Sequence, residues 1–479
     1  MTRRELFALA PAAFAQPGHP PLHRRAIVSR HNPEFHAPDF TAPLSVGNGE
    51  FAFTADFTGL QTFPELYERT TPLCTQSQWG WHTSPIPHGL DPSQLRLKTF
   101  DTYGRRVGYA TSARGQEPLY NWMRENPRRL NLARIGLLLG GAPLRLEEIT
   151  AIDQKLDLWT GILESRFRLR GEPVAVVTCC HPSEGLLAVT ITSPLVARGL
   201  AVVIDFPYGS PEMNASDWKS PDRHSTRVAS QTSTSLLLDR QLDQDKYTVD
   251  IGAPRGVLRD KHRVVLEGKG SELNFVCRFA PSRSNATLPA TGSVRQTAAR
   301  YWSGFWSIGG TIDFSGSTDP RAQELERRAV LSQYLTAIQC AGSSPPQETG
   351  LTCNSWYGKF HLEMYLWHAA HFALWNRASL LERSLGWYSQ ILPSARERAH
   401  QQGYAGARWP KMTALDGRDS PSPIGPLLIW QQPHPILLAE LCYPKDPEGN
   451  GRRMFQEIVF ESAEFMASYA VERDGRYML

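Results

Sequence analysis

The spacing of apolar residues changes once along this chain, and that change limits the folds open to it. From about residue 17 to residue 295, short apolar runs alternate with turn residues. In the stretch 130–195 these runs are separated by Gly-Gly, Pro and Ser-Glu-Gly turns. Many short strands at a spacing of roughly 8–12 residues are typical of a large antiparallel sandwich. The first part of the chain therefore predicts a β-sandwich.

After residue 295 the apolar residues follow a helical period. Tyr301, Trp302, Phe305 and Trp306 fall on one side of a helix. The next helix is expected to begin with Asp319 as N-cap and Pro at the first helical position. Further helices are expected near residues 360–376, 377–401, 430–443 and 452–472.

A strand-rich part followed by a helix-rich part implies two domains. With 479 residues, the chain is also long enough for two. The predicted division is a β-sandwich domain at 16–295, a linker helix region at 296–318 and a helical domain at 319–479.

The first fifteen residues have the composition of a signal peptide. Arg3 and Arg4 precede a mostly apolar run, which ends in Ala13-Phe14-Ala15. The paired arginines are typical of a twin-arginine signal. This pattern predicts export, to the periplasm or outside the cell. Elsewhere no apolar run approaches the roughly 18 residues of a membrane span, so none is expected.

Composition excludes some functions and leaves others open. The net charge is only +4, and Lys and Arg are scattered, so no nucleic-acid surface is expected. The seven Cys form no CxxC pair and are expected to be buried free thiols. Thirteen Trp suit either sugar stacking or core packing. No Walker A, GxSxG or GxGxxG motif is present, and no cofactor is predicted.

The stretch from Cys353 to Trp375 concentrates chemistry in one place: CNSWYGKFHLEMYLWHAAHFALW. On a helix starting near residue 360, Glu363 and Trp367 share a face. A buried carboxylate needs a partner, so Glu363 is expected either to grip sugar hydroxyls, to act as an acid or base, or to pair with Lys359 or Arg377. The histidines of this stretch do not match HExxH, and no metal site is predicted.

Four stretches together resemble glycoside hydrolase family 65, which contains phosphorylases and hydrolases of α-glucosides. They are LSVGNGEFAFTADFTGLQ at 44–61, DQKLDLWTGILESRF at 153–167, RYWSGFW with the following helix at 300–335, and the stretch at 353–375, which is similar to the family motif GH-x-FWDTE-x-W. The resemblance implies an N-terminal β-supersandwich, a linker helix and an (α/α)6 barrel, as in six-hairpin glycosidases.

The resemblance also implies site residues. It places the family's substrate-gripping Asp at Glu363 and a later family Trp at Trp367. The segment GARWPKM resembles a family loop that lines the pocket. The residues expected to bind substrate are Trp356, Lys359, His361, Trp367, Arg408, Trp409, Lys411 and Gln432.

This sequence departs from the family where catalysis is concerned. In QQPHPI, Gln432 occupies the position of the family's general acid, and an amide cannot donate that proton. Glu363, Asp419 and His434 are therefore the candidates for catalysis. Only about half of the barrel's roughly twelve helices are expected, so the chain is predicted to be truncated or its barrel incomplete. The family's catalytic base would lie further downstream.

The predicted function is hydrolysis of a glycosidic bond, with a carbohydrate as the partner. Inversion is expected, with two carboxyl groups roughly 6.5–9.5 Å apart. A phosphorylase, a non-catalytic sugar-binding protein, and a polysaccharide lyase using Tyr357 or Tyr365 with His361 remain as alternatives.

Overall fold

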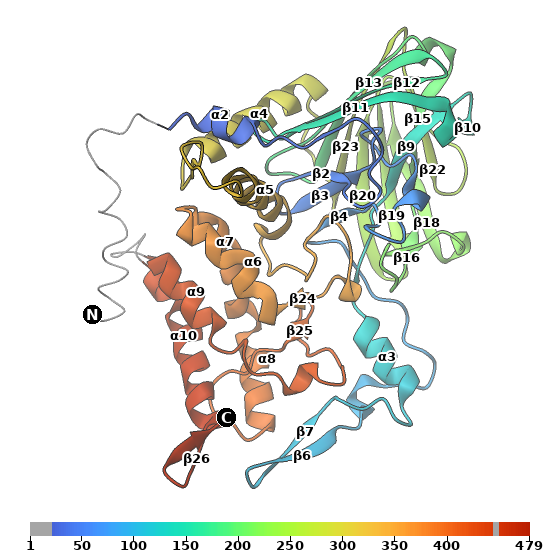
Figure 1. Ribbon diagram of the computed structural model, residues 1–479. Helices are drawn as coiled ribbons and strands as arrows, with labels where there is room; N and C mark the ends of the chain where they lie inside the picture. Colours follow the sequence, from blue (N-terminus) through green and yellow to red (C-terminus); the bar gives the residue numbers. More distant parts are fainter. Residues whose placement is uncertain (1–21, 444–449) are drawn as a thin grey trace.

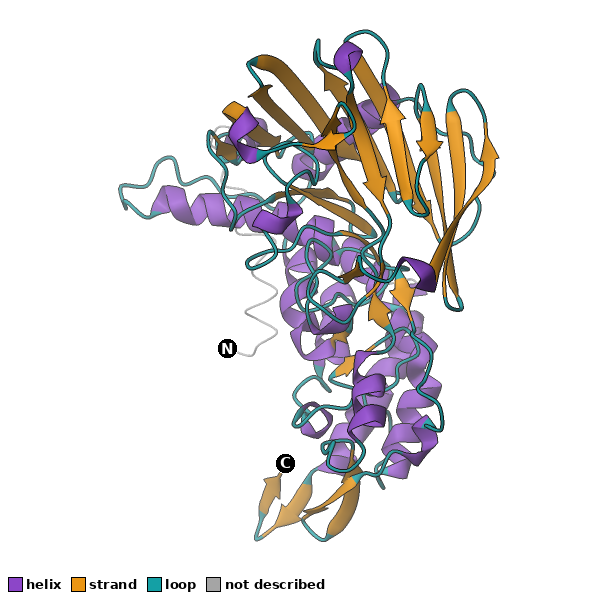
Figure 2. Cartoon of the chain, turned by 90° about the vertical axis from the view of Figure 1, so that its right-hand side faces the viewer, coloured by secondary structure: helices purple, strands orange, loops and turns teal. Residues whose placement is uncertain are grey.

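The computed structural model describes residues 22–443 and 450–479. The predicted signal peptide at 1–15 lies outside these residues. The strands gather in one half of the molecule and the helices in the other (Figures 1 and 2).

Two antiparallel sheets form the first half, as the sequence predicts. The larger has the strand order β1 (Glu34–Phe35), β11 (Ile149–Asp157), β12 (Ile162–Leu169), β13 (Glu172–Cys180), β14 (Leu186–Thr192), β23 (Glu272–Ala280), β20 (Asp245–Gly252), β19 (Ser235–Leu242), β18 (His224–Gln231). The smaller has the order β10 (Ala142–Pro143), β9 (Arg134–Leu139), β15 (Leu200–Asp205), β22 (Arg263–Glu267), β21 (Gly256–Leu258).

Shorter strands and two helices complete this half or join it to the rest. A third sheet contains β2 (Leu44–Gly47), β3 (Phe51–Ala55) and β4 (Thr75–Ser77). The two-stranded pairs are β5 (Trp81–His82) with β8 (Arg128–Arg129), β6 (Lys98–Thr102) with β7 (Arg105–Tyr109), and β16 (Tyr208–Gly209) with β17 (Ser216–Asp217). The helices are α2 (Arg24–Ser29) and α3 (Glu117–Glu125).

Strand alternation explains the sandwich core. In β12, every second residue from Leu163 to Leu169 is buried, whereas Glu164, Arg166 and Arg168 between them are exposed. The buried side chains point to one face and join a core shared by both sheets. The adjacent Cys179 and Cys180 of β13 belong to two different hydrophobic clusters on opposite faces. All seven cysteines are free; six are buried, as predicted, and Cys353 is partly exposed.

The linker helix α4 (Thr291–Ser307) packs its aromatic face as the sequence predicts. Trp302, Phe305 and Trp306 are buried, and the Trp306 indole donates to the Leu158 carbonyl at 2.6 Å. Gly161 is required beneath this helix, because a Cβ there would lie 2.1 Å from the Trp302 ring.

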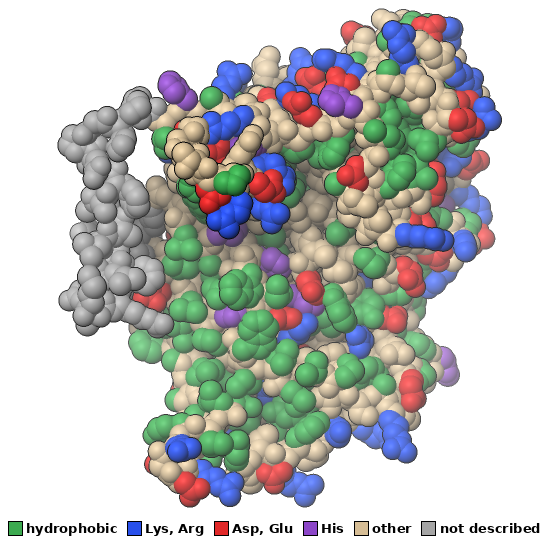
Figure 3. Space-filling view, in the orientation of Figure 1, with side chains coloured by type: hydrophobic (Ala, Val, Ile, Leu, Met, Phe, Trp, Pro, Cys, Tyr) green, Lys and Arg blue, Asp and Glu red, His purple; other side chains and the backbone are tan. Residues whose placement is uncertain are grey.

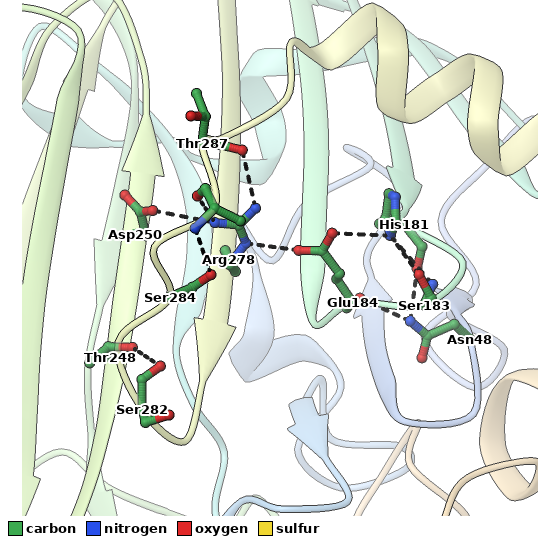
Figure 4. A network of polar contacts seen from close by, with 11 residues as sticks. Asn48, His181, Ser183, Glu184, Thr248, Asp250, Arg278, Ser282, Ser284 and Thr287 are labelled. Atoms are coloured by element: carbon green, nitrogen blue, oxygen red, sulfur yellow. Dashed lines mark hydrogen bonds and ion pairs between the residues drawn. The ribbon is translucent and has the colours of Figure 1, made fainter.

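Asn48 fixes the turn between β2 and β3. Its Oδ1 accepts from the backbone N–H of Glu50 and Phe51 at 2.9 and 2.8 Å. Its Nδ2 donates to the carbonyls of His181 and Glu184 at 2.7 and 2.9 Å (Figure 4). The side chain thus fixes both its own turn and the loop after β13, which is a structural role.

The second half contains six helices after the linker in the described residues. They are α5 (Ala322–Cys340), α6 (Leu362–Leu374), α7 (Ala378–Leu385), α8 (Trp387–Gln401), α9 (His434–Cys442) and α10 (Asn450–Tyr469). Short strand pairs accompany them: β24 (Phe360–His361) with β25 (Met412–Thr413), and β26 (Val471–Arg473) with β27 (Arg476–Met478). Within the described ranges no helix is both long and apolar enough to cross a membrane.

Some bounds of the predicted helices are wrong. Helix α9 begins at His434 rather than near residue 430, and α10 ends at Tyr469, three residues before its predicted end. Helix α5 begins at Ala322, two residues later than expected, because Asp319 accepts the backbone N–H of Arg321 at 2.8 Å in a turn ahead of the helix. The helix predicted at 377–401 is divided into α7 and α8 at Gly386.

Candidate functional site

A tight turn at the junction of the two halves presents an aromatic side chain. The short helix η6 (Trp356–Gly358) has three consecutive positive φ angles, of 48°, 64° and 66°. For Trp356 and Tyr357 this conformation is uncommon and strained. Position 358 requires glycine, because a Cβ there would lie 2.1 Å from the Cβ of Arg129 in β8. The β half therefore holds this turn in place.

Trp356 is accessible and is flanked by cations. Its side chain is 48% exposed. Lys411 Nζ and the Arg124 guanidinium each lie 5.7 Å from its ring centroid, and the His361 ring lies 6.3 Å away. An exposed indole with hydrogen-bonding groups around it suits stacking against a sugar ring.

Glu363 lies in the first turn of α6, directly beside this platform. Pairing of β24 with β25 places Lys411 next to it, and the Leu362 N–H donates to the Lys411 carbonyl at 2.9 Å. Oε1 of Glu363 lies 2.6 Å from Lys411 Nζ, whereas the buried Oε2 has no hydrogen-bond partner. Burial raises the pKa of the Glu363 carboxyl, and Lys411 offsets part of that rise.

His361 is fully buried and neutral. Its Nδ1–H donates to the Lys359 carbonyl at 3.0 Å, because a carbonyl can only accept. Burial lowers the pKa of the ring to about 3, so Nε2 carries a lone pair. That nitrogen lies 3.3 Å from Oε2 of Glu348 without hydrogen-bond geometry.

His434 lies at the start of α9 and contacts the backbone at Leu362, the residue before Glu363. Its Nδ1–H donates to the Leu362 carbonyl at 2.9 Å, and its ring is 6.0 Å from that of Trp430. Burial lowers the pKa of His434, which favours the neutral ring. A neutral ring of this tautomer offers a lone pair at Nε2 and no acidic proton there.

Arg408, Trp409 and Gln432 form a separate buried cluster. Gln432 accepts from the Trp409 N–H at 2.9 Å and donates to the Trp409 carbonyl at 2.7 Å, so its amide clamps that backbone. The Trp409 indole donates to Ser462 at 2.8 Å. Arg408 donates to the Pro426 carbonyl and the Tyr109 hydroxyl at 2.7 and 3.1 Å.

Three further predicted residues are not among the described contacts of the Trp356 ring. Lys359 Nζ is buried and donates to the carbonyls of Met123 and Asn126 and to Ser420, and burial lowers the pKa of its ammonium to about 7. Asp419 has a buried, unpartnered Oδ1, and burial raises the pKa of its carboxyl. Trp367 of α6 is 65% exposed.

The structure thus brings together Trp356, His361, Glu363 and Lys411. It adds Glu348 and Arg124, which the sequence did not indicate. Glu348 follows α5 in a loop without periodicity, and Arg124 lies on α3 in the other half of the chain. No local pattern marks either residue, since both approach the site only through the fold.

Within the described ranges, no group of three or more His, Cys, Asp or Glu side chains is arranged to hold a metal ion. His368 and His371 instead contact backbone carbonyls, those of Glu348 and His368 respectively.

Comparison with known proteins decides the fold. A solved structure assigned as a kojibiose phosphorylase, from the human microbiome, matches with a TM-score of 0.57 at 13% sequence identity. The chain has a glycoside phosphorylase-like fold. The alignment covers 95% of this chain but 59% of the phosphorylase, so the chain spans about three fifths of that protein's length. The predicted sandwich, linker and helical barrel region are thereby confirmed as a fold.

A second structure is more distant. It is a family GH92 α-mannosidase from Bacteroides thetaiotaomicron in complex with mannoimidazole, matched with a TM-score of 0.36 at 10% identity over 75% of this chain and 52% of that one. A likeness of that size carries no argument. No protein-family model matches the sequence, and no curated protein matches it.

Proposed function

We propose that this protein cleaves a glycosidic bond, and that the sugar next to that bond stacks on Trp356. One observation carries the proposal: Glu363 is a buried carboxyl with one oxygen on Lys411 and the other unpartnered, beside an exposed indole. Sugar sites combine such an aromatic face with a few fixed polar groups. The phosphorylase-like fold supports a carbohydrate as substrate.

In the proposed reaction, Glu363 protonates the departing glycosidic oxygen. A general acid must hold its proton near the working pH, and the raised pKa of Glu363 favours this. Lys411 fixes the position of the carboxyl. The proposed role of Arg408, Trp409 and Gln432 is to support the wall of the site behind Glu363. Asp419 and His434 are the alternative candidates for proton transfer.

A phosphorylase is the second candidate, and the cations at the site favour it. Lys411 and Arg124 both lie over the Trp356 ring, and such groups can bind phosphate. In a phosphorylase, phosphate replaces water as the nucleophile. Phosphate dependence of cleavage therefore separates the two functions.

The test is a cleavage assay on α-linked glucose disaccharides, kojibiose among them, with and without phosphate. We expect new reducing ends from the wild type, and a fall of about 10²–10⁴-fold in kcat for Glu363→Gln. The exposed Glu440 on α9 gives a matched control, and Glu440→Gln should leave the rate unchanged. Binding without cleavage by every form would contradict the enzymatic function and indicate a sugar-binding protein.

We also propose export, on the basis of Arg3 and Arg4 and the apolar run after them. Fractionation of cells that express the full chain, compared with a variant carrying Lys at both positions, tests this. Retention of both forms in the cytoplasm would overturn it.

A further inference from the structure

The backbone around Glu348 is held from both sides, so its carboxylate has a fixed place. The preceding Gln347 forms a β-bridge with Phe360 of β24. The Glu348 carbonyl itself accepts from His368 Nε2 of α6 at 3.1 Å. The side chain, 37% exposed, extends toward His361. A carboxylate on a backbone fixed in this way is preorganised.

The contact between Glu348 and His361 is a contact between two acceptors. His361 Nδ1 carries the ring proton, because it faces the Lys359 carbonyl, so Nε2 presents a lone pair. The Glu348 carboxylate, 3.3 Å from that nitrogen, also only accepts. Neither satisfies the other, and Nε2 is buried without a hydrogen bond. One O–H-bearing molecule with two hydrogens would satisfy both groups.

Glu348 and Glu363 are linked by a chain of side-chain contacts. The ring centroids of His361 and Trp356 lie 6.3 Å apart, and Lys411 Nζ lies 5.7 Å from the Trp356 centroid. The same Nζ lies 2.6 Å from Oε1 of Glu363. The charge of Glu348 reaches Glu363 and contributes to the rise in its pKa. Each of the two carboxyl groups is therefore separated from the exposed indole by one intervening side chain, His361 or Lys411.

We propose that Glu348 is the general base of this site, and that its carboxylate and His361 Nε2 together hold the water that attacks the sugar. This assignment rests on the proposed glycosidic cleavage and on hydrolysis in particular. One water hydrogen bonds to each acceptor, which leaves an oxygen lone pair directed at the anomeric carbon.

The step balances without a co-reactant. As the water oxygen bonds to the anomeric carbon, Glu348 takes one water proton. The glycosidic C–O bond breaks, and Glu363 gives its proton to the leaving oxygen. Glu363 ends ionised and Glu348 ends protonated, and exchange with solvent resets both. Attack from the side opposite the leaving group inverts the anomeric centre.

The decisive experiment is chemical rescue of Glu348→Gln. We expect its kcat for the disaccharide cleaved fastest to fall by about 10²–10⁴-fold with a similar KM. Azide should restore cleavage, because it needs no base, and should yield a glycosyl azide of inverted configuration. Glu440→Gln is the control, and circular dichroism checks that each variant is folded. Undiminished hydrolysis by Glu348→Gln, or a loss that azide does not restore, would overturn the assignment.

A second measurement does not depend on turnover. Deoxynojirimycin is a cationic analogue of glucose, so the wild type should bind it more tightly than glucose. Glu348→Gln should lose about tenfold in affinity for the cation and little for glucose. Equal affinities in both forms would overturn the placement of Glu348, even if the wild type cleaves nothing and the proposed function fails. Cleavage by the wild type only with phosphate would also overturn the role of base.

Discussion

The two halves of the molecule differ in how many large apolar side chains they expose. Among the described residues, six strongly exposed large hydrophobic side chains lie between residues 22 and 295, and fourteen lie between 296 and 479. Figure 3 shows the same contrast, with hydrophobic side chains gathered over the helical half and charged ones more frequent over the sheets. One hydrophobic core runs through both halves, but the helical half leaves more apolar surface exposed than the sandwich does.

Unpartnered buried polar atoms show a second contrast. Many of them lie at the junction, among them His361 Nε2, Glu363 Oε2, Asn354 Oδ1 and Gln347 Oε1. Native proteins keep few such atoms unpaired, and water or a bound molecule can satisfy them. The comparison favours the junction, where the helices meet the sandwich, as the place of the proposed recognition.

The largest expected effect is a loss of stability after a substitution in the core of the sandwich. Phe275 of β23 is 1% exposed, and Phe275→Ala should lower the free energy of unfolding by about 3–5 kcal/mol, because it leaves a cavity in the core. Phe460 of α10 is 65% exposed, and Phe460→Ala should change the free energy of unfolding by less than about 0.5 kcal/mol. Urea unfolding followed by fluorescence measures both. Similar losses in the two variants would remove the contrast between the halves.

A smaller effect is expected inside the helical half, at the Gln432 clamp. In Gln432→Glu, an ionised carboxylate cannot donate to the Trp409 carbonyl, and the free energy of unfolding should fall by about 1–3 kcal/mol at pH 7. The clamp raises the pKa of the substituted carboxyl above its unfolded value of about 4.3. The lost stability should therefore return as the pH falls toward 4.

Urea unfolding at pH 7 and pH 4 measures this recovery. The exposed Gln390 on α8 provides the control, since Gln390→Glu should show no such dependence on pH. If Gln432→Glu instead keeps its stability and gains cleavage activity, the amide occupies a catalytic position rather than a structural one.

Local patterns predicted much of the fold. Alternation gave the strands, as in β12, and the helical period gave the buried aromatic face of α4. The resemblance indicated Glu363, which the fold places beside Trp356 and Lys411. The start of α5 was missed because Asp319 caps a turn rather than the helix.

Contacts between distant segments could not be predicted. The Gln432 clamp joins residues 23 positions apart, and Arg129 meets Gly358 across 229 positions. Glu348 reaches the site only because its loop bridges to β24. Such contacts depend on packing, which no single stretch of sequence records.

The central claim is that the exposed Trp356 is the sugar platform, and the chain contains its own control. Trp367 is also exposed, at 65% against 48% for Trp356, but it is Trp356 that has the Lys411, Arg124 and His361 side chains around its ring. Calorimetric titration of the wild type, Trp356→Ala and Trp367→Ala with the same disaccharide compares them directly. The account predicts that Trp356→Ala weakens binding about tenfold or more, which is about 1.4 kcal/mol, while Trp367→Ala binds as the wild type does. Equal affinities for the two variants, or a loss confined to Trp367→Ala, would contradict it.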